Sequence, residues 1–176
     1  MIFRSIILAS IFILGYVESQ QCPDQYTLTP DKKHCVRLHL GLSVMQQYAG
    51  ALCELEDAYL PKITETYMNT FVYNIASRSS AEVWLGIQCT GTIDNNTISC
   101  SWQDGSLVIY NNWAKGFPND YVGQCAYMGV EGNGAGKWIS SDCDLTQHSF
   151  MCEKDLANST TRKDMPSKLN KINLKL

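Results

Sequence analysis

The sequence lacks several patterns that mark common classes of protein. A net charge of −3 over 176 residues and a pI near 5.5 leave no broad basic surface for a nucleic acid, so we expect no nucleic-acid partner. No two cysteines have the C-x-x-C spacing of a zinc site, and no G-x-S-x-G motif supplies a serine nucleophile. No segment recurs with the period of a repeat protein. The sequence therefore argues against all four of these classes.

Long apolar runs are scarce as well, and the single clear one lies at the N-terminus. It extends from Ile6 to Leu14, after the positive charge of Arg4 and before Val17-Glu18-Ser19. This arrangement is typical of a secretory signal peptide with cleavage after Ser19. The run is shorter than the roughly 17–25 apolar residues that span a bilayer. We therefore expect residues 1–19 to be removed and the mature protein to be secreted, without a transmembrane segment.

Cysteine, by contrast, is abundant. Eight cysteines behind a signal peptide indicate disulfides formed in an oxidising compartment. The charge balance changes after the last of them, Cys152: residues 22–152 carry 7 Lys and Arg against 13 Asp and Glu, whereas residues 153–176 carry 6 against 3. The stretch from Asn158 to Lys168 is polar and has no clear amphipathic period. We predict one domain over residues 22–152 and a flexible basic tail over residues 153–176.

Two segments in the first half of this domain have the apolar spacing of amphipathic helices. Ser43 and Gln46 have the spacing of a capping box, which predicts a helix from Ser43 towards Glu56. Its buried face is expected to contain Val44, Tyr48, Ala51, Leu52, Cys53 and Leu55. A second helix is predicted to begin at Thr64-Glu65, with a buried face formed by Tyr67, Phe71, Val72 and Ile75.

The second half of the domain has a different pattern. Residues 83–87 are a continuous apolar run, which predicts a central strand. From Cys89 to Cys152, short apolar pieces alternate with turns rich in Gly, Asn and Asp. Two helices followed by many short strands and long loops predict an α+β fold.

The cysteines and tryptophans of this domain occur in a characteristic order. The elements are Cys22, Cys35, Cys53, Trp84-Leu85-Gly86-Ile87, Trp102-Gln103-Asp104-Gly105, Tyr110-Asn111-Asn112-Trp113, Gly116-Phe117-Pro118-Asn119, Cys125, Gly136-Lys137-Trp138, Cys143 and Phe150-Met151-Cys152. Over about three quarters of the chain this order resembles that of a C-type lectin-like domain, and it is most similar to secreted nematode members of the family. The resemblance implies an α+β C-type lectin-like fold: two helices, short antiparallel sheets and a long loop region, held together by disulfides.

The resemblance also implies how the cysteines pair, which the sequence alone leaves open among 105 arrangements. In the family, the cysteine of the first helix pairs with the last one, and two cysteines late in the domain pair with each other. Long-form members close an N-terminal hairpin with a further disulfide, and the two cysteines left over are close enough to pair locally. The expected disulfides are Cys53–Cys152, Cys125–Cys143, Cys22–Cys35 and Cys89–Cys100.

Family members that bind sugar through calcium hold the ion with carboxylates and amides of the long loop. The Glu-Pro-Asn or Gln-Pro-Asn motif of the family reads Phe117-Pro118-Asn119 here, and its Trp-Asn-Asp motif reads Trp138-Ile139-Ser140. Gly123 stands where a further carboxylate is usual. Asn119 keeps its motif position, Asp120 beside it is an auxiliary candidate, and Asp142 is two residues out of register. We therefore expect a degenerate calcium site, with no metal ion and no cofactor.

Phe117 has two interpretations. In the first, it packs on Trp113 or Tyr110 and supports the turn at Pro118. In the second, it forms an aromatic platform with Trp113 and Tyr121 for the apolar face of a sugar or for a protein. The candidate ligand-binding residues are Trp113, Phe117, Asn119, Asp120 and Tyr121.

The sequence contains two further sets of candidate residues, its histidines and its N-x-[ST] motifs. The three histidines, His34, His39 and His148, have no recognisable nucleophile partner, so each is interpreted as an isolated surface residue and we expect no catalytic residues and no enzyme. Asn95 and Asn158 begin N-x-[ST] motifs, and both are predicted glycosylation sites in a secreted chain.

These features predict a secreted recognition protein. The resemblance implies a glycan or glycoprotein ligand on a host or microbial surface, bound without a functional calcium site and in the context of innate defence. The alternative is a protein-binding or structural extracellular module that has lost sugar recognition. Glycan binding measured with and without calcium distinguishes the two.

Overall fold

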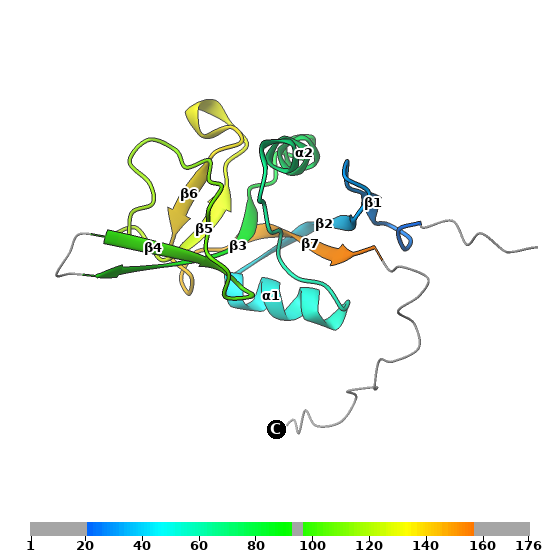
Figure 1. The fold of residues 1–176 in the computed structure, drawn as a ribbon, viewed down its shortest axis with the longest axis horizontal. Helices are drawn as coiled ribbons and strands as arrows, with labels where there is room; N and C mark the ends of the chain where they lie inside the picture. The colour runs from blue at the N-terminus through cyan, green and yellow to red at the C-terminus, as the bar shows by residue number, and fades with distance from the viewer. Residues whose placement is uncertain (1–20, 93–96, 157–176) are drawn as a thin grey trace, which may run out of the picture. The chain divides into compact units, whose positions relative to one another are not determined.

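The computed structural model describes residues 21–92 and 97–156 and contains two helices and seven strands within them (Figure 1). The predicted signal peptide, the predicted glycosylation sites Asn95 and Asn158, and residues 157–176 lie outside the described residues. None of the helices described is long and apolar enough to cross a membrane. In chain order, the elements are β1 (Thr27–Leu28), β2 (His34–Val44), α1 (Gln46–Leu55), α2 (Thr66–Ser77), β3 (Val83–Thr92), β4 (Thr97–Trp102), β5 (Cys125–Met128), the short 3-10 helix η1 (Gly132–Gly134), β6 (Trp138–Ser141) and β7 (His148–Asp155).

The strands form one mixed sheet in the order β1-β2-β7-β3-β5-β6, with β4 paired to β3. Strand β3 pairs antiparallel with β4 and β5 and parallel with β7. The two helices, the short strands and the long loop match the α+β C-type lectin-like fold that the resemblance implies, and the parallel β3–β7 pair is an addition to the expected antiparallel pairing. Because β7 pairs with both β2 and β3, it joins the first and second halves of the domain into one sheet, and this long-range pairing has no local signal in the sequence.

The two helices cover opposite faces of this sheet (Figure 1). Side chains alternate between the faces of a strand, and β3 shows the consequence. Trp84 packs in the cluster of α1, whereas Val83, Leu85 and Ile87 pack in the cluster of α2. The apolar run at residues 83–87 is continuous because both faces of β3 are covered, as predicted for a central strand.

The buried face of α1 differs from the predicted one. The helix begins at Gln46, since Ser43 and Val44 belong to β2. Tyr48 and Leu55 are exposed, and the buried residues are Gln46, Ala49, Gly50 and Cys53. Long-range contacts select this face. The Gln46 side chain donates hydrogen bonds to the Leu85 and Ile87 carbonyls at 2.8 and 3.0 Å, and Cys53 bonds to Cys152.

Helix α2 also deviates from its predicted face. Of the four apolar residues expected on it, only Val72 is fully buried, and Tyr67 is exposed. The buried residues of the helix are Met68, Asn69, Val72 and Ala76. Asn69 accepts a hydrogen bond from Trp138 Nε1 at 2.7 Å and donates one to the Gly136 carbonyl at 2.9 Å. A polar residue therefore takes a core position because it anchors the tryptophan of β6.

The disulfides join the pairs that the family resemblance implies: Cys22–Cys35, Cys53–Cys152, Cys89–Cys100 and Cys125–Cys143. The folded unit does not end at Cys152, however. Strand β7 continues to Asp155, paired with β2, and both Glu153 and Leu156 are buried. The first residues of the predicted tail therefore belong to the sheet, because their pairing partners lie at the start of β2.

Candidate ligand-binding site

The long connection between β4 and β5 is held against the core by Trp138. The Ala114 amide donates to the Trp138 carbonyl at 2.9 Å, and the Trp138 amide donates to the Asn112 carbonyl at 3.0 Å. Three aromatic rings meet the buried Trp138 indole edge-on with centroid separations of 5.6–5.8 Å: Trp102, Tyr110 and Trp113. The position of Trp113 is therefore set by the core.

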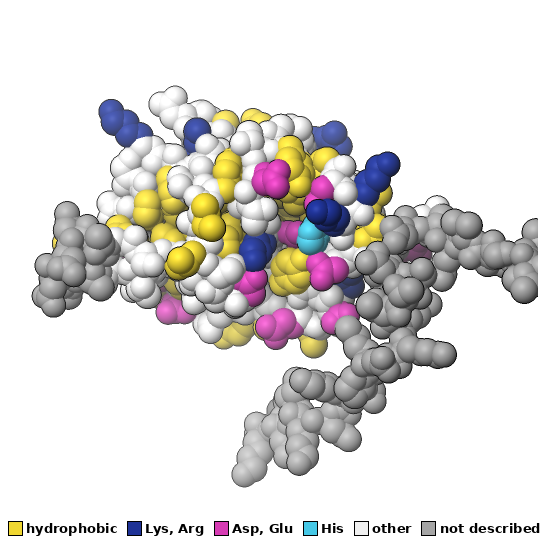
Figure 2. Space-filling view, viewed as in Figure 1, with side chains coloured by type: hydrophobic (Ala, Val, Ile, Leu, Met, Phe, Trp, Pro, Cys, Tyr) yellow, Lys and Arg dark blue, Asp and Glu magenta, His cyan; other side chains and the backbone are white. Residues whose placement is uncertain are grey.

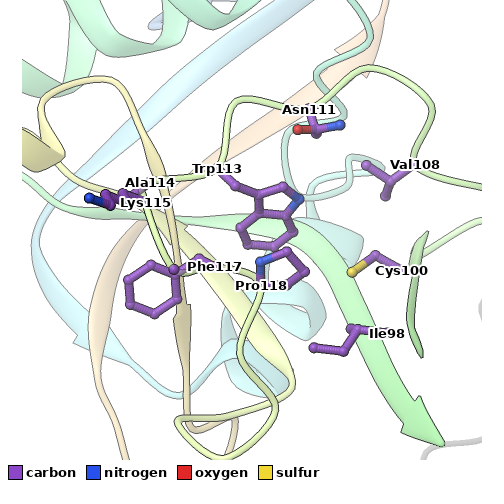
Figure 3. A pocket seen from close by; sticks show the side chains of 10 residues that line it. Ile98, Cys100, Val108, Asn111, Trp113, Ala114, Lys115, Phe117 and Pro118 are labelled. Atoms are coloured by element: carbon purple, nitrogen blue, oxygen red, sulfur yellow. The ribbon is translucent and has the colours of Figure 1, made fainter. Parts of the chain in front are cut away.

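An open hollow of about 530 Å³ lies between this loop and β4. Strand β4 contributes Ile98 and Cys100, and the loop contributes Val108, Asn111 and residues 113–118. Figure 3 shows the Trp113 indole in the middle of this group, with the Phe117 ring on one side and Cys100 and Ile98 on the other. The Cys89–Cys100 disulfide thus belongs to one wall of the hollow.

Phe117 adopts neither of its two expected arrangements in full. It is half-buried, and none of the aromatic ring pairs among the described residues includes it. Trp113 and Tyr110 pack against Trp138 instead. Phe117 lines the hollow together with Trp113, whereas Tyr121 is 98% exposed and is not part of the lining. Two of the three proposed rings, Trp113 and Phe117, therefore line the hollow.

The other two candidate residues, Asn119 and Asp120, contact groups outside the hollow. Asn119 Oδ1 accepts the Tyr121 amide at 3.1 Å, and the Asn119 amide donates to Ser140 Oγ at 2.9 Å. The Asp120 carboxylate lies against Gly91 of β3, where an added Cβ would be only 2.0 Å from Asp120 Oδ2. Of the five residues selected from the sequence, the structure therefore brings Trp113 and Phe117 together and leaves the other three outside the hollow.

The positions where family members carry calcium ligands do not fit a calcium ion here. At Gly123 an added Cβ would lie 2.2 Å from the carbonyl carbon and oxygen of Ser141, so no carboxylate side chain has room. Ser140 is buried and its hydroxyl accepts the Asn119 amide, while Ile139 offers no oxygen from its side chain. Calcium requires six to eight oxygen ligands, and these residues do not provide such a set.

One other group of metal-type side chains occurs in the part of the chain that the structure describes. It consists of His39, Glu56 and Cys152. The sulfur of Cys152 is bonded to Cys53, so it is not available as a thiolate ligand. His39 stacks on Phe150 with ring centroids 4.5 Å apart. The Glu56 carboxylate accepts the Tyr26 hydroxyl at 2.6 Å and lies 3.3 Å from the Arg37 guanidinium, so this group is better explained as a set of polar contacts beside the Cys53–Cys152 disulfide.

The expectation that His148 is an isolated surface residue was wrong. It is buried, with Nε2 3.3 Å from Ser141 Oγ and Nδ1 3.3 Å from Glu82 Oε2. Burial lowers the pKa of His148 to about 4, so the imidazole is neutral at neutral pH. Ser141 is 5% exposed, and the chain of contacts therefore fastens β6 to β7. No sequence signal could reveal it, because Glu82 is far from Ser141 and His148 in the chain, and the latter two meet only through the placement of their strands, β6 and β7, in the sheet.

The fold and this loop define the class of protein. The family model "Lectin C-type domain" matches residues 43–154, and the chain belongs to this C-type lectin family. It is 39% identical over 90 residues to C-type lectin domain-containing protein 38 of Caenorhabditis elegans, a match that covers 50% of this chain. The chain spans 22% of that relative's length. It also matches C-type mannose receptor 2 of Mus musculus, Homo sapiens and Rattus norvegicus, of whose length it spans 10%.

Solved structures show the same fold. The carbohydrate-recognition domain of the mouse scavenger receptor C-type lectin has a TM-score of 0.64 at 25% identity, covering 78% of this chain and 98% of that one. The Ca²⁺-independent C-type lectin SPL-2 from Saxidomus purpuratus has a TM-score of 0.64 at 24% identity, covering 78% and 96%.

Proposed function

We propose that this protein is a secreted lectin that binds carbohydrate in the hollow between β4 and the long loop, without calcium. The observation that carries the proposal is the hollow itself: on a C-type lectin domain, Trp113 and Phe117 line an open depression of about 530 Å³. This volume is within the range of roughly 300–1,000 Å³ that is usual for small-ligand sites.

The lining has the two kinds of group that sugar binding requires. Trp113 and Phe117 are half-buried rings that offer apolar surface to the C–H face of a sugar. Asn111 and Lys115 are exposed polar side chains beside them, and they provide an amide and an ammonium group for hydroxyl groups. Aromatic packing and hydrogen bonds together hold a sugar without a metal ion.

The comparisons support this proposal in part. The mouse structure is a carbohydrate-recognition domain, and SPL-2 is a Ca²⁺-independent lectin with the same fold. The poor fit of Gly123, Ile139 and Ser140 to calcium favours the same conclusion. The signal-peptide pattern of residues 1–19 supports secretion, and a glycan on a microbial or host surface would place the protein in innate defence.

The test is binding to a glycan array, in calcium and in chelator, with the product exported by cells that express the full chain. Its intact mass after deglycosylation should correspond to a chain that begins at Gln20. We expect glycan binding that chelator does not abolish and that Phe117→Ala weakens severalfold. Tyr121→Ala is the matched control, because it removes an exposed ring of the same loop from outside the hollow.

Two results would contradict the proposal. Glycan binding that chelator abolishes would show that calcium takes part. Complete absence of glycan binding, with a folded protein, would favour the alternative of a protein-binding or structural module.

A further inference from the structure

The charged part of the lining of the hollow is of one sign, positive. Of the described residues that line it, Lys115 alone is charged, and no Asp or Glu is among them. The remaining lining is apolar apart from Asn111 and the backbone. The nearest carboxylate of the candidate residues, Asp120, is directed to Gly91 and is not part of the lining. Among the side chains of residues 21–92 and 97–156, a ligand in the hollow therefore meets one cation and no anion.

Lys115 occupies a defined position in the loop. The Phe117 amide donates to the Ala114 carbonyl at 3.1 Å, which places Lys115 and Gly116 at the two central positions of a β-turn. The φ of Gly116 is +89°, as the second central position of a type II turn requires. The Ala114 amide is bonded to Trp138, so the turn is tied to the core. Figure 3 shows Lys115 on the same side of Trp113 as the Phe117 ring.

The ammonium group of Lys115 also has no competing anion in the part of the chain that the structure describes. None of the ion pairs among residues 21–92 and 97–156 includes it. Lys62, in contrast, contacts Asp104 at 2.6 Å, and the Lys137 ammonium donates to Asn112 Oδ1 at 2.8 Å. Lys115 is exposed and its charge is available to a ligand.

The charge of the whole domain limits how acidic that ligand can be. Residues 22–152 carry more acidic than basic side chains, and in the face shown in Figure 2 the Lys and Arg side chains are scattered among acidic ones. Such a surface repels a polyanion. A single acidic group placed at Lys115 is attracted by the Lys115 ammonium group. Because it carries one charge, the acidic side chains of the domain repel it only weakly.

We infer that the ligand of this hollow is a glycan with one acidic group, a carboxylate or a sulfate, and that Lys115 selects it over the neutral form. The inference rests on the proposed carbohydrate-binding function. The apolar face of the sugar packs on the Trp113 and Phe117 side of the hollow, and the Lys115 ammonium donates to the acidic group. Lys115 is thus a specificity-determining residue of a calcium-independent site.

The experiment measures the affinities of matched oligosaccharides with and without the acidic group, in a sialylated pair and in a sulfated pair. For the wild type we expect about a fivefold preference for the acidic member of at least one pair, the size of an exposed ion pair, and a smaller preference at high salt. The pair that shows the preference identifies the carboxylate or the sulfate. Lys115→Ala should reduce the preference to about one, and Lys115→Arg should retain it.

Lys33→Ala is the matched control, since it removes an exposed lysine of the N-terminal hairpin and the same charge. Equal affinity for the acidic and neutral members, with Phe117→Ala still weakening both, would overturn the inference and leave the proposed function intact. A preference that persists in Lys115→Ala would also overturn it. Failure to bind either member would overturn the proposed function and the inference together.

Discussion

At the scale of single residues, Glu153 is a carboxylate held inside the fold. It is 2% exposed, its Oε2 accepts the Lys62 amide at 3.0 Å, and its Oε1 lies 3.4 Å from His34 Nδ1. Burial, with a smaller contribution from the charge of Asp155, raises the pKa of Glu153 from its usual 4.5 to about 7. The folded protein therefore binds a proton at a pH where the unfolded chain has released it.

This raised pKa predicts a pH dependence of stability. Between about pH 4.5 and pH 7 the folded state binds more protons than the unfolded state, so the contribution of Glu153 to stability is lost as the pH rises. Glu153→Gln keeps an acceptor for Lys62 and removes the charge. We expect it to stabilise the protein above pH 7 by up to about 3 kcal/mol and to have little effect near pH 4.5.

Urea denaturation at the two pH values measures the difference. Glu54→Gln, which removes an exposed carboxylate of α1, is the control and should leave both midpoints nearly unchanged. If Glu153→Gln destabilised the protein equally at both pH values, the buried carboxylate would be charged and stabilised by its neighbours. The upward shift of its pKa would then be wrong.

At the scale of elements, the Cys53–Cys152 disulfide joins α1 to β7 and closes a segment with a sequence separation of 99. The Cys22–Cys35 disulfide joins residues separated by 13 within the N-terminal hairpin. In the chain-entropy description, a longer closed loop restricts the unfolded chain more. The two bonds should therefore differ in how much they stabilise the protein.

We expect the double variant Cys53→Ala/Cys152→Ala to lose about 2 kcal/mol more stability than Cys22→Ala/Cys35→Ala. Chemical denaturation of the two variants and the wild type gives both losses. The former variant leaves the helix–sheet contact without its covalent link, and it should also melt at the lower temperature. Equal losses would mean that local packing outweighs the entropy of loop closure in this fold.

At the scale of the whole molecule, calcium provides a test that does not depend on knowing the ligand. An ion that binds only the folded state raises its stability, by about 2.7 kcal/mol at a hundredfold excess over Kd. Because Gly123 has no space for a side chain and Ser140 is already hydrogen-bonded, we expect melting curves in millimolar calcium and in chelator to overlap. A drop of several degrees in chelator would contradict this, and Asn119, Asp120 and Asp142 would be the first residues to substitute.

Sequence reasoning succeeded where a signal is local or belongs to a known family pattern. The apolar run at residues 83–87 predicted a buried strand because both faces of β3 are covered. It failed for the face of α1, where size and apolar character suggested Tyr48 and Leu55, yet small residues and Gln46 face the sheet. Close packing and the two hydrogen bonds from Gln46 to β3 decided that orientation, and neither can be read from periodicity.

The sequence by itself determined the family, the presence of two helices and the central strand, because the order of cysteines, tryptophans and apolar runs is a property of the chain. The family pattern also determined the disulfide partners. The tertiary structure alone decided which residues share a site. It brought Trp113 and Phe117 together beside Lys115 and directed Asn119 and Asp120 elsewhere. The physical reason is that the loop follows its anchor on Trp138, and that anchor depends on contacts with α2 and β4 from distant parts of the chain.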